Sequence, residues 1–290
     1  MADRLLVIGT GLLGIKLVKL AGKELEVFAA DKAPVPGIGK VLDLDITNCA
    51  SCEAAILKIK PRFVVLTAAL TNVDQCEREK ELAYGINAEG PGNVARACRK
   101  AGAKLVYVST DYVFDGTKGN YRETDAANPI NHYGYTKLIG EKAVQEALGD
   151  SVVARTSVLY GWNPVKSNFV MWVIDSLKNG KEISVVNDQF TTPTYVGDLS
   201  EMILALMKND CRGTYHTCGA ERINRYDFAV KIADVFGLDA SLIKPTTSDK
   251  LNWTAKRPMD SSLNTEKISK IKNPLDIRSG LEAMKKEQRC

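Results

Sequence analysis

The feature that most limits the fold of this chain is a short apolar run followed at once by a glycine turn and a helix-forming segment. The run Leu5–Gly9 carries no charge, and apolar residues at helical spacing follow over Leu12–Leu20. A continuous apolar run of this length is typical of a parallel strand buried on both faces. The start of the chain therefore predicts a strand–turn–helix unit.

The same alternation continues to about residue 160. Further strands are expected at Glu26–Ala30, Phe63–Leu66, Lys104–Ser109 and Ser151–Thr156. Helices are expected at Asn48–Lys60, Asp74–Lys100 and Pro129–Leu148. We expect the second of these helices to be broken near Gly85 and around Gly90-Pro91. Strands alternating with helices form right-handed βαβ units, so the sequence predicts an α/β fold, a doubly wound parallel sheet of Rossmann type.

Composition excludes several other classes of protein. Hydrophobic residues make up 45% and charged residues 26% of the 290 residues, which fits a globular protein and not a disordered, collagen-like or coiled-coil chain. A chain this long needs no disulfides, so its seven cysteines suit a reducing cytoplasm. The net charge is only +4, and no apolar run approaches the ~20 residues of a membrane span. We therefore expect a cytoplasmic protein with no nucleic-acid or membrane partner.

The glycine turn has the pattern of a dinucleotide-binding site. Its residues are Gly9, Thr10, Gly11, Leu12, Leu13 and Gly14. In a G-x-G-x-x-G turn between strand and helix, the first glycine makes the tight turn. The second lets a pyrophosphate approach the backbone, and the third packs helix on strand. The free N–H groups at the start of the helix then bind the anion.

An acidic residue ends the second expected strand. Asp31 follows Gly14 by 17 residues, and a carboxylate there accepts hydrogen bonds from the adenosine ribose. Asp31 favours NAD because it repels the 2′-phosphate of NADP, whereas Lys32 is able to pair with that phosphate. We expect NAD or NADP, with NAD slightly favoured. Asp45 and Ile46 either bracket the adenine or simply begin a helix.

Two residues on the expected helix Pro129–Leu148 form a candidate catalytic pair. Tyr133 and Lys137 are four residues apart, which places them on one helix face. Thr110 lies at the carboxyl end of a strand, where ligands bind in such sheets. A tyrosine with an ordinary pKa of ~10 is a poor acid or base, and a nearby ammonium lowers that pKa. Together, Thr110, Tyr133 and Lys137 indicate a hydride-transfer site at a C–O centre.

The regular alternation fades after Tyr160. Helices are expected at Asn168–Asn179, Gly197–Lys208 and Arg225–Phe236, a strand is expected at Tyr215–Cys218, and the last 45 residues are expected to be mostly helical. We expect residues 1–160 to form an NAD(P)-binding Rossmann domain. Residues 161–290 are expected to form a smaller C-terminal substrate-binding lobe, with segments that return to the Rossmann sheet.

Motifs along nearly the whole chain resemble one known family. Besides Gly9–Gly14 they are Ala68–Glu77, Asn87–Pro91, Ser109–Gly116, Tyr133–Lys137, Arg155–Ser157, Tyr160-Gly161, Asn168–Val170, Asp188-Gln189, Pro193-Thr194 and Arg257-Pro258. They are similar to those of the extended short-chain dehydrogenase/reductases, and most similar to the dTDP-4-dehydrorhamnose reductases. The block Ser109–Gly116, which reads S-T-D-Y-V-F-D-G, is the most specific of them.

The resemblance implies an activity and a set of residues. The activity is NAD(P)H-dependent reduction of the 4-keto group of a nucleotide-diphosphate sugar, dTDP-4-dehydrorhamnose to dTDP-L-rhamnose. The catalytic set implied is Thr110, Tyr133 and Lys137. The residues implied at the cofactor are Tyr133, Lys137, the loop Ala68, Ala69 and Leu70, and Asn87, which would support a water relay behind Lys137. Asp111 and Tyr112 are expected to contact the substrate. A homodimer is the default assembly.

Two other functions on this fold stay open. A nucleotide-sugar dehydratase or epimerase is one, but a dehydratase would need an Asp-Glu pair after the threonine, and here Tyr112 follows Asp111. A non-catalytic regulator is the other, because Tyr112–Thr117 and Val158–Gly161 are similar to the regulatory β subunit of methionine adenosyltransferase. The complete set of Thr110, Tyr133 and Lys137 favours catalysis.

Some positions depart from the family pattern or stand outside it. The glycine turn is one residue shorter than the usual G-x-x-G-x-x-G, and Val158 stands where many relatives carry a sugar-contacting tryptophan. Arg257 is expected to grip a diphosphate, since a guanidinium binds such groups through two hydrogen bonds. His132 is expected either to touch substrate or to cap its helix. His216 is expected to be a packed core histidine.

Overall fold

A parallel sheet of seven strands forms the centre of the larger part of the molecule. The computed structural model describes residues 3–33, 38–164 and 166–288. In spatial order the strands are β11 (Gly213–His216), β6 (Val152–Thr156), β5 (Lys104–Thr110), β4 (Phe63–Leu66), β1 (Arg4–Ile8), β2 (Glu26–Asp31) and β3 (Val41–Asp43). The order reverses direction between β1 and β4, which is where such sheets bind ligands. The predicted doubly wound parallel sheet is confirmed, and the short edge strand β3 is an addition to it.

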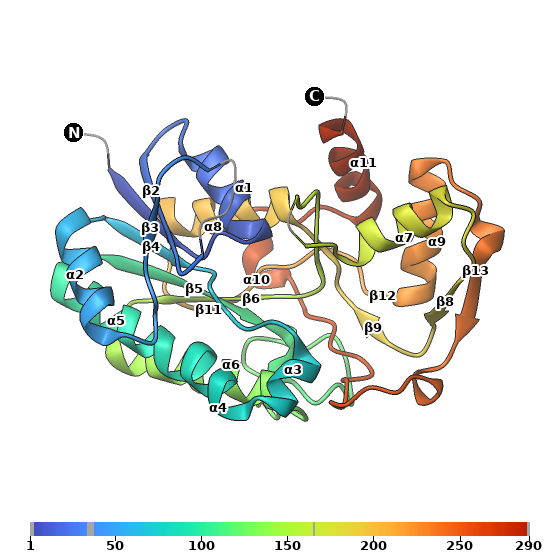
Figure 1. Ribbon diagram of the computed structural model, residues 1–290, viewed down its shortest axis with the longest axis horizontal. Helices are drawn as coiled ribbons and strands as arrows, with labels where there is room; N and C mark the ends of the chain where they lie inside the picture. Colours follow the sequence, from blue (N-terminus) through green and yellow to red (C-terminus); the bar gives the residue numbers. More distant parts are fainter. Residues whose placement is uncertain (1–2, 34–37, 165, 289–290) are drawn as a thin grey trace.

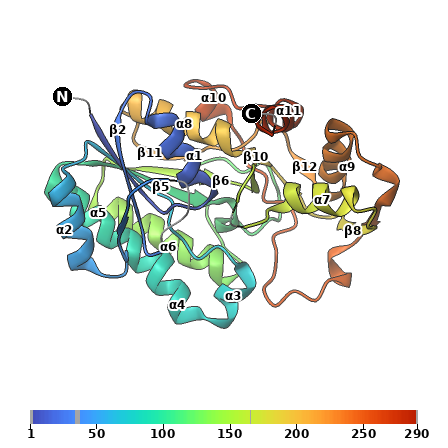
Figure 2. The ribbon, with the colours of Figure 1, turned by 45° about the horizontal axis from the view of Figure 1, so that its top comes forward.

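Helices cover both faces of this sheet (Figures 1 and 2). On one face lie α1 (Leu12–Ala21) and α8 (Val196–Lys208), and on the other lie α2 (Cys49–Ile59), α5 (Gly90–Ala101) and α6 (His132–Ala147). The β1 side chains alternate between two apolar clusters. Leu5 and Val7 belong to the α1 side, and Leu6 and Ile8 to the α2 side. The uninterrupted apolar run at the start of the chain is therefore the signature of a strand buried on both faces.

A smaller lobe stands beside the sheet, on the right in Figure 1. Its elements are α7 (Phe169–Lys178), α9 (Arg225–Phe236), α11 (Ile277–Glu287) and the short strand pairs β8 (Ile183–Val186) with β13 (Ile243–Thr246), β9 (Phe190–Thr191) with β12 (Ile223–Asn224), and β7 (Leu159–Tyr160) with β10 (Thr194–Tyr195). Between these elements the chain returns to the large sheet, as α8 on one face and as edge strand β11.

The expected break at Gly85 and Gly90-Pro91 was wrong. Helix α3 (Val73–Arg78) ends at Glu79, and from there α4 (Lys80–Tyr84), a π-helical turn (Gly85–Glu89) and α5 follow without interruption. A proline inside a helix clashes with the carbonyl four residues earlier, here that of Asn87. The wide π turn moves this carbonyl aside, and Tyr107 Oη donates to it at 3.3 Å.

The expectation that the last 45 residues are mostly helical was also wrong. Up to residue 288, where the described part of the chain ends, only α10 (Glu266–Ser269) and α11 are α-helical there. The segment Pro258–Asn264 is extended and pairs with a loop at Tyr121, through the bridge Tyr121↔Leu263, and with strand β9 of the smaller lobe, through the bridge Phe190↔Asp260. Because its backbone groups form hydrogen bonds with these segments, they find partners without a helix. No helix in the described ranges is long and apolar enough to cross a membrane.

The cysteines of the described residues are free thiols. Cys49 is exposed and Cys52 is buried in the first turns of α2, where burial raises the Cys52 pKa to about 12. Cys290 lies outside the described residues. Within the described ranges no group of His, Cys, Asp or Glu side chains is arranged to hold a metal ion.

Candidate active site

The glycine turn joins β1 to α1 at the carboxyl edge of the sheet. Gly9 has φ +100°, and a Cβ there would lie 2.4 Å from Ala68 N. A Cβ on Gly14 would lie 1.9 Å from Gly9 O, so only glycine allows this turn to pack on the helix. A Cβ on Gly11 would meet nothing within 4 Å. No side chain caps the α1 N-terminus at Gly11. Open space before uncapped N–H groups is what a dinucleotide pyrophosphate requires, so these residues fit the cofactor.

Asp31 is tied to the glycine turn. Its Oδ2 accepts from Thr10 N at 2.6 Å and from Thr10 Oγ1 at 2.7 Å. Among the residues that the structure describes, its Oδ1 accepts only a long 3.4 Å bond from Ala33 N, so this oxygen keeps capacity to accept from a ribose hydroxyl. The carboxylate therefore stabilises the turn, and its contact with an adenosine ribose stays a prediction.

Lys32 and Asp45 form an ion pair at 2.6 Å. Asp45 Oδ1 also accepts from the N–H and hydroxyl of Thr47. Hydrogen bonds from Lys32 and Thr47 lower the Asp45 pKa to about 2. Asp45 thus forms a turn shortly before α2, whose N-cap is Asn48, and a contact of Asp45 and Ile46 with adenine stays a prediction. Ile46 is buried in the α2-side cluster.

The loop Ala68–Leu70 is held by Asn87. Leu70 N donates to Asn87 Oδ1 at 2.8 Å, and Asn87 Nδ2 donates back to Leu70 O at 3.0 Å. Asn87 Nδ2 also donates to Thr136 Oγ1 at 3.3 Å. The side chain of Asn87 therefore fixes the loop beside the glycine turn. Its water relay to Lys137 stays a prediction.

The three candidate catalytic residues come from two adjoining elements. Thr110 ends β5, and Tyr133 and Lys137 lie in the first turns of α6. Asn131 caps this helix by accepting from Gly134 N at 2.8 Å. A Cβ on Gly134 would lie 2.0 Å from Tyr112 O, so the glycine lets α6 approach the turn after Thr110 closely. The Tyr133 ring packs edge-on against Tyr112 at 5.8 Å.

Burial controls the electrostatics of this set. It lowers the pKa of Lys137 to about 7, against the opposing effect of Glu141. It raises the pKa of Tyr133, and a hydrogen bond with Thr110 opposes that rise. The expected lowering of the Tyr133 pKa by the Lys137 ammonium is therefore not found. Lys137 Nζ instead donates to Val108 O at 2.8 Å.

A buried ion pair behind the set was missed by sequence reasoning. Arg155 Nη2 lies 2.7 Å from Glu141 Oε2, and Ser109 Oγ donates to Glu141 Oε1 at 2.5 Å. Glu141 lies one helical turn beyond Lys137, and that i, i+4 spacing is the signal that could have found it. Arg155 belongs to the motif Arg155–Ser157, for which the sequence analysis gave only a resemblance to the reductase family and no role.

Asp111, the residue after Thr110, is almost fully buried. Only 3% of it is exposed. Its Oδ2 accepts from Ser157 Oγ at 2.8 Å and Ser261 Oγ at 2.5 Å, and its Oδ1 accepts from Thr110 Oγ1 at 3.1 Å. Burial raises the Asp111 pKa against these hydrogen bonds. These hydroxyls enclose the carboxylate, and the expected contact of Asp111 with the substrate stays a prediction.

A cleft of about 230 Å³ opens between the sheet edge and the smaller lobe. It is lined by aromatic, apolar and cationic side chains, namely Tyr112, Phe169, Trp172, Ser184, Val185, Val186, Gln189, Arg225, Leu251, Trp253 and Arg257. Tyr112 connects this cleft to Tyr133. Arg257 pairs with Asp74 at 2.9 Å and lies 5.4 Å from the Trp253 ring. Arg257 thus lines this cleft, and its expected contact with a diphosphate stays a prediction.

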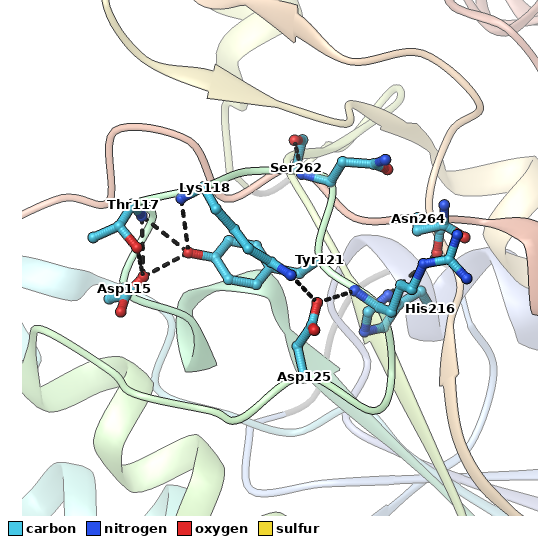
Figure 3. Close-up of polar contacts among 10 residues, drawn as sticks. Asp115, Thr117, Lys118, Tyr121, Asp125, His216, Ser262 and Asn264 are labelled. Carbon is cyan, nitrogen blue, oxygen red and sulfur yellow. Dashed lines mark hydrogen bonds and ion pairs between the residues drawn. The ribbon is translucent and has the colours of Figure 1, made fainter.

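The two histidines have different surroundings. His216 is fully buried, its ring Nδ1 lies 3.2 Å from Asn264 O, and burial lowers its pKa to about 3 (Figure 3). The prediction of a packed core histidine is confirmed. His132 begins α6, and its ring Nε2 lies 3.1 Å from Lys80 O, so it neither caps the helix nor lines the cleft.

A glycine turn that fits a dinucleotide and a Thr–Tyr–Lys set at the same sheet edge define a nicotinamide-dependent oxidoreductase. The chain belongs to the family described as the RmlD substrate binding domain, whose model matches residues 3–290. It is 37% identical over 262 residues to a dTDP-4-dehydrorhamnose reductase of Streptomyces griseus, covering 88% of this chain and 83% of the relative. The resemblance seen in the motifs is confirmed.

Two further comparisons bear on function. The crystal structure of dTDP-4-dehydrorhamnose reductase from Bacillus anthracis in complex with NADP has a TM-score of 0.91 and 36% identity, and the match covers 99% of this chain and 100% of that one. The chain is also 34% identical over 235 residues to methionine adenosyltransferase 2 subunit beta of Xenopus tropicalis, covering 79% of this chain and 70% of the relative.

Proposed function

We propose that this protein reduces the 4-keto group of a nucleotide-linked 6-deoxysugar with NADH or NADPH, converting dTDP-4-dehydrorhamnose to dTDP-L-rhamnose. The observation that carries the proposal is the joining of Thr110, Tyr133 and Lys137 at the sheet edge that holds the glycine turn. The named reductases among its relatives support the same reaction.

Side chains of this protein supply the proton for the reduction and orient the substrate. A bound reduced nicotinamide supplies the hydride. Tyr133 donates a proton to the carbonyl oxygen on which negative charge develops, and the Thr110 hydroxyl turns from Asp111 Oδ1 to donate its hydrogen bond to the same oxygen. Lys137 binds the ribose next to the nicotinamide. Its buried position, with a pKa of about 7, makes its charge responsive to what binds beside it.

The composition of the cleft supports a nucleotide-diphosphate sugar as substrate. Arg225 and Arg257 supply guanidinium groups suited to a diphosphate. Phe169, Trp172 and Trp253 supply ring faces suited to a nucleobase. Because Tyr112 joins this cleft to Tyr133, the sugar would reach the catalytic tyrosine while the diphosphate lies among the arginines.

For the cofactor, we propose that the protein uses both NADH and NADPH and prefers NADH. Asp31 Oδ1, which accepts a long bond from Ala33 N, would accept from a ribose hydroxyl and would repel a 2′-phosphate. Lys32 is three-quarters exposed, so it is free to leave Asp45 and neutralise that phosphate.

We further propose that the two parts of the chain bind different ligands. Residues 1–160 bind the dinucleotide and residues 161–290 bind the nucleotide sugar, apart from α8 and β11, which join the large sheet. A cytoplasmic homodimer is the assembly we expect, and sedimentation of the purified protein tests the dimer.

A second candidate function is a non-catalytic regulatory subunit, which the 34% identity to methionine adenosyltransferase 2 subunit beta favours. A dehydratase is disfavoured, because burial raises the pKa of Tyr112, the residue that stands where a dehydratase needs a carboxylate base.

The deciding experiment follows the absorbance of the reduced nicotinamide with a panel of 4-keto-6-deoxysugar nucleotides. Oxidation of the cofactor that depends on the sugar supports the reductase. Absence of turnover across the panel, with stable binding to a methionine adenosyltransferase catalytic subunit, supports the regulator.

A further inference from the structure

A buried amide in the cleft between the sheet edge and the smaller lobe has no partner in the described chain. Gln189 lines this cleft of about 230 Å³, and only 5% of the residue is exposed. Its side-chain Nε2 is buried and has no hydrogen-bond partner within the described ranges. A buried amide donor without an acceptor is costly, so such a group in a cleft points to a ligand that accepts from it.

The backbone around Gln189 is fixed on both sides. Gln189 O accepts from Arg225 N, at the start of α9, at 3.2 Å. Phe190 N donates to Met259 O at 2.7 Å, and Phe190 O accepts from Ser261 N at 3.1 Å. The main chain at this position is therefore held by two other segments, and the unpartnered amide belongs to a fixed part of the cleft wall.

Gln189 lies close to the end of β5 that carries Thr110. Two residues further along the chain, Thr191 Oγ1 is hydrogen-bonded to Ser157 Oγ. Ser157 comes directly after β6, which pairs with β5 up to Thr110. Because two residues of extended chain span about 7 Å, the backbone of Gln189 lies within the length of one sugar ring of Thr191.

A series of contacts also leads from Gln189 to the proposed proton donor. Arg225, whose N–H binds Gln189 O, reaches Tyr112 with its guanidinium. Burial raises the pKa of Tyr112, and the hydrogen bond from Arg225 opposes that rise. The ring of Tyr112 in turn lies 5.8 Å from that of Tyr133. The amide of Gln189 therefore belongs to the part of the cleft next to the reacting centre.

The proposed substrate has hydroxyl groups in this part of the cleft. Its C4 carbonyl is assigned to Tyr133 and Thr110, and the diphosphate on C1 is assigned to Arg225 and Arg257. The ring atoms between C4 and C1 are C2 and C3, and each carries a hydroxyl. A hydroxyl accepts from an amide N–H and donates to an amide carbonyl, so the carboxamide of Gln189 matches it.

We propose that Gln189 is a specificity-determining residue whose side-chain amide binds the hydroxyl on C2 or C3 of the sugar ring. The inference rests on the proposed function, which assigns the sugar to this cleft. It adds that the protein selects sugars that carry this hydroxyl and discriminates against the corresponding deoxysugar.

The test compares Gln189→Leu, which removes the amide and keeps a side chain of similar size, with the wild type. Calorimetry gives Kd values for dTDP-L-rhamnose, its 2-deoxy and 3-deoxy analogues, and dTDP alone. The wild type should bind one of the two analogues about tenfold more weakly than dTDP-L-rhamnose, the scale of one lost hydrogen bond. Gln189→Leu should bind dTDP-L-rhamnose about tenfold more weakly, lose this discrimination and keep the wild-type Kd for dTDP.

Gln145→Leu is the matched control, because Gln145 is exposed on α6 and binds Thr214 Oγ1 at 3.3 Å. It should bind all four ligands as the wild type does. The melting temperature of Gln189→Leu should not fall, since Nε2 has no partner to lose within the described ranges. A structural role of the amide would lower it.

Several results would overturn the proposal. In Gln189→Leu these are an unchanged Kd for dTDP-L-rhamnose, or an equal loss of affinity for dTDP, which would assign the amide to the diphosphate. Equal binding of both analogues and dTDP-L-rhamnose by the wild type also overturns it. If the wild type binds dTDP-L-rhamnose but turns over no 4-keto sugar, the reductase function fails and the Kd comparison still decides the role of Gln189. If the wild type binds neither dTDP nor dTDP-L-rhamnose, both fail.

Discussion

Lys137 Nζ lies 2.8 Å from the carbonyl oxygen of Val108, two residues before Thr110 on the same strand. The ammonium also stands 4.1 Å from the centre of the Tyr107 ring. Lys137, which lies one helical turn after Tyr133, therefore holds helix α6 against β5. The distance between the tyrosine and the threonine is thus set by elements of the core and not by loops.

Replacing Tyr133 by phenylalanine removes the proton donor and keeps the ring. We expect kcat to fall ~10²–10⁴-fold, the usual contribution of general acid catalysis, with little change in NADH affinity. Steady-state turnover with titration of NADH checks both. Tyr135→Phe is the control, because Tyr135 is 44% exposed, and it should leave kcat unchanged. Full activity of Tyr133→Phe would remove the tyrosine from the mechanism.

The buried Lys137 predicts a pH dependence of stability. Its pKa is about 7 in the folded protein and 10.5 in its ordinary state, so between these values the unfolded chain binds more protons. The contribution of Lys137 to the free energy of unfolding therefore rises with pH through this window. Relative to Lys137→Met, the wild type should gain stability between about pH 7 and pH 10, as measured by guanidinium unfolding. A constant difference between the two proteins would contradict the lowered pKa.

Valine at Gly11 should reduce cofactor affinity without harming the fold. A Cβ at this position meets no protein atom within 4 Å, so the side chain would enter the space assigned to the pyrophosphate. Calorimetric Kd values for NADH should rise at least about tenfold, with an unchanged melting temperature. Gly149→Val, at an exposed turn whose nearest atom would be 4.0 Å away, is the control. Unchanged affinity in Gly11→Val would show that the dinucleotide lies elsewhere.

Alanine at Asp31 should change the preference between the two cofactors. It removes the ribose acceptor for NADH and also the charge that repels the phosphate of NADPH. We expect the Kd for NADH to rise about tenfold more than that for NADPH. Asp43→Ala is the control, since Asp43 is opposite Asp31 on β3 and has no bond to Thr10. A larger loss for NADPH than for NADH would reject the ribose contact.

Periodicity and turn chemistry predicted the large sheet well. The apolar runs at Leu5–Gly9 and Phe63–Leu66 each became a strand buried on both faces. The helix start at Asn48 was readable because an asparagine there caps the backbone N–H of Ser51. The local sequence pattern was enough to predict an element wherever that element buries its own apolar face.

Sequence reasoning failed where long-range contacts decide. The carbonyl of Asn87 is bonded by Tyr107, and this contact, with the π turn, lets a helix pass through Pro91. The hydroxyls of Ser157 and Ser261 that enclose Asp111 could not be predicted either, because their positions depend on contacts with the smaller lobe. The Arg155–Glu141 pair likewise joins residues 14 positions apart in sequence, on different elements.

The most direct test of the central claim is the fate of a labelled hydride. The protein is incubated with dTDP-4-dehydrorhamnose and NADH that carries deuterium at the transferable position of nicotinamide C4, and the product is analysed by NMR. We predict dTDP-L-rhamnose with deuterium at C4 of the sugar, and Tyr133→Phe should form it ~10²–10⁴-fold more slowly. A sugar recovered without deuterium at C4 in the presence of the wild-type protein would contradict the assignment of this chain as a 4-keto sugar reductase.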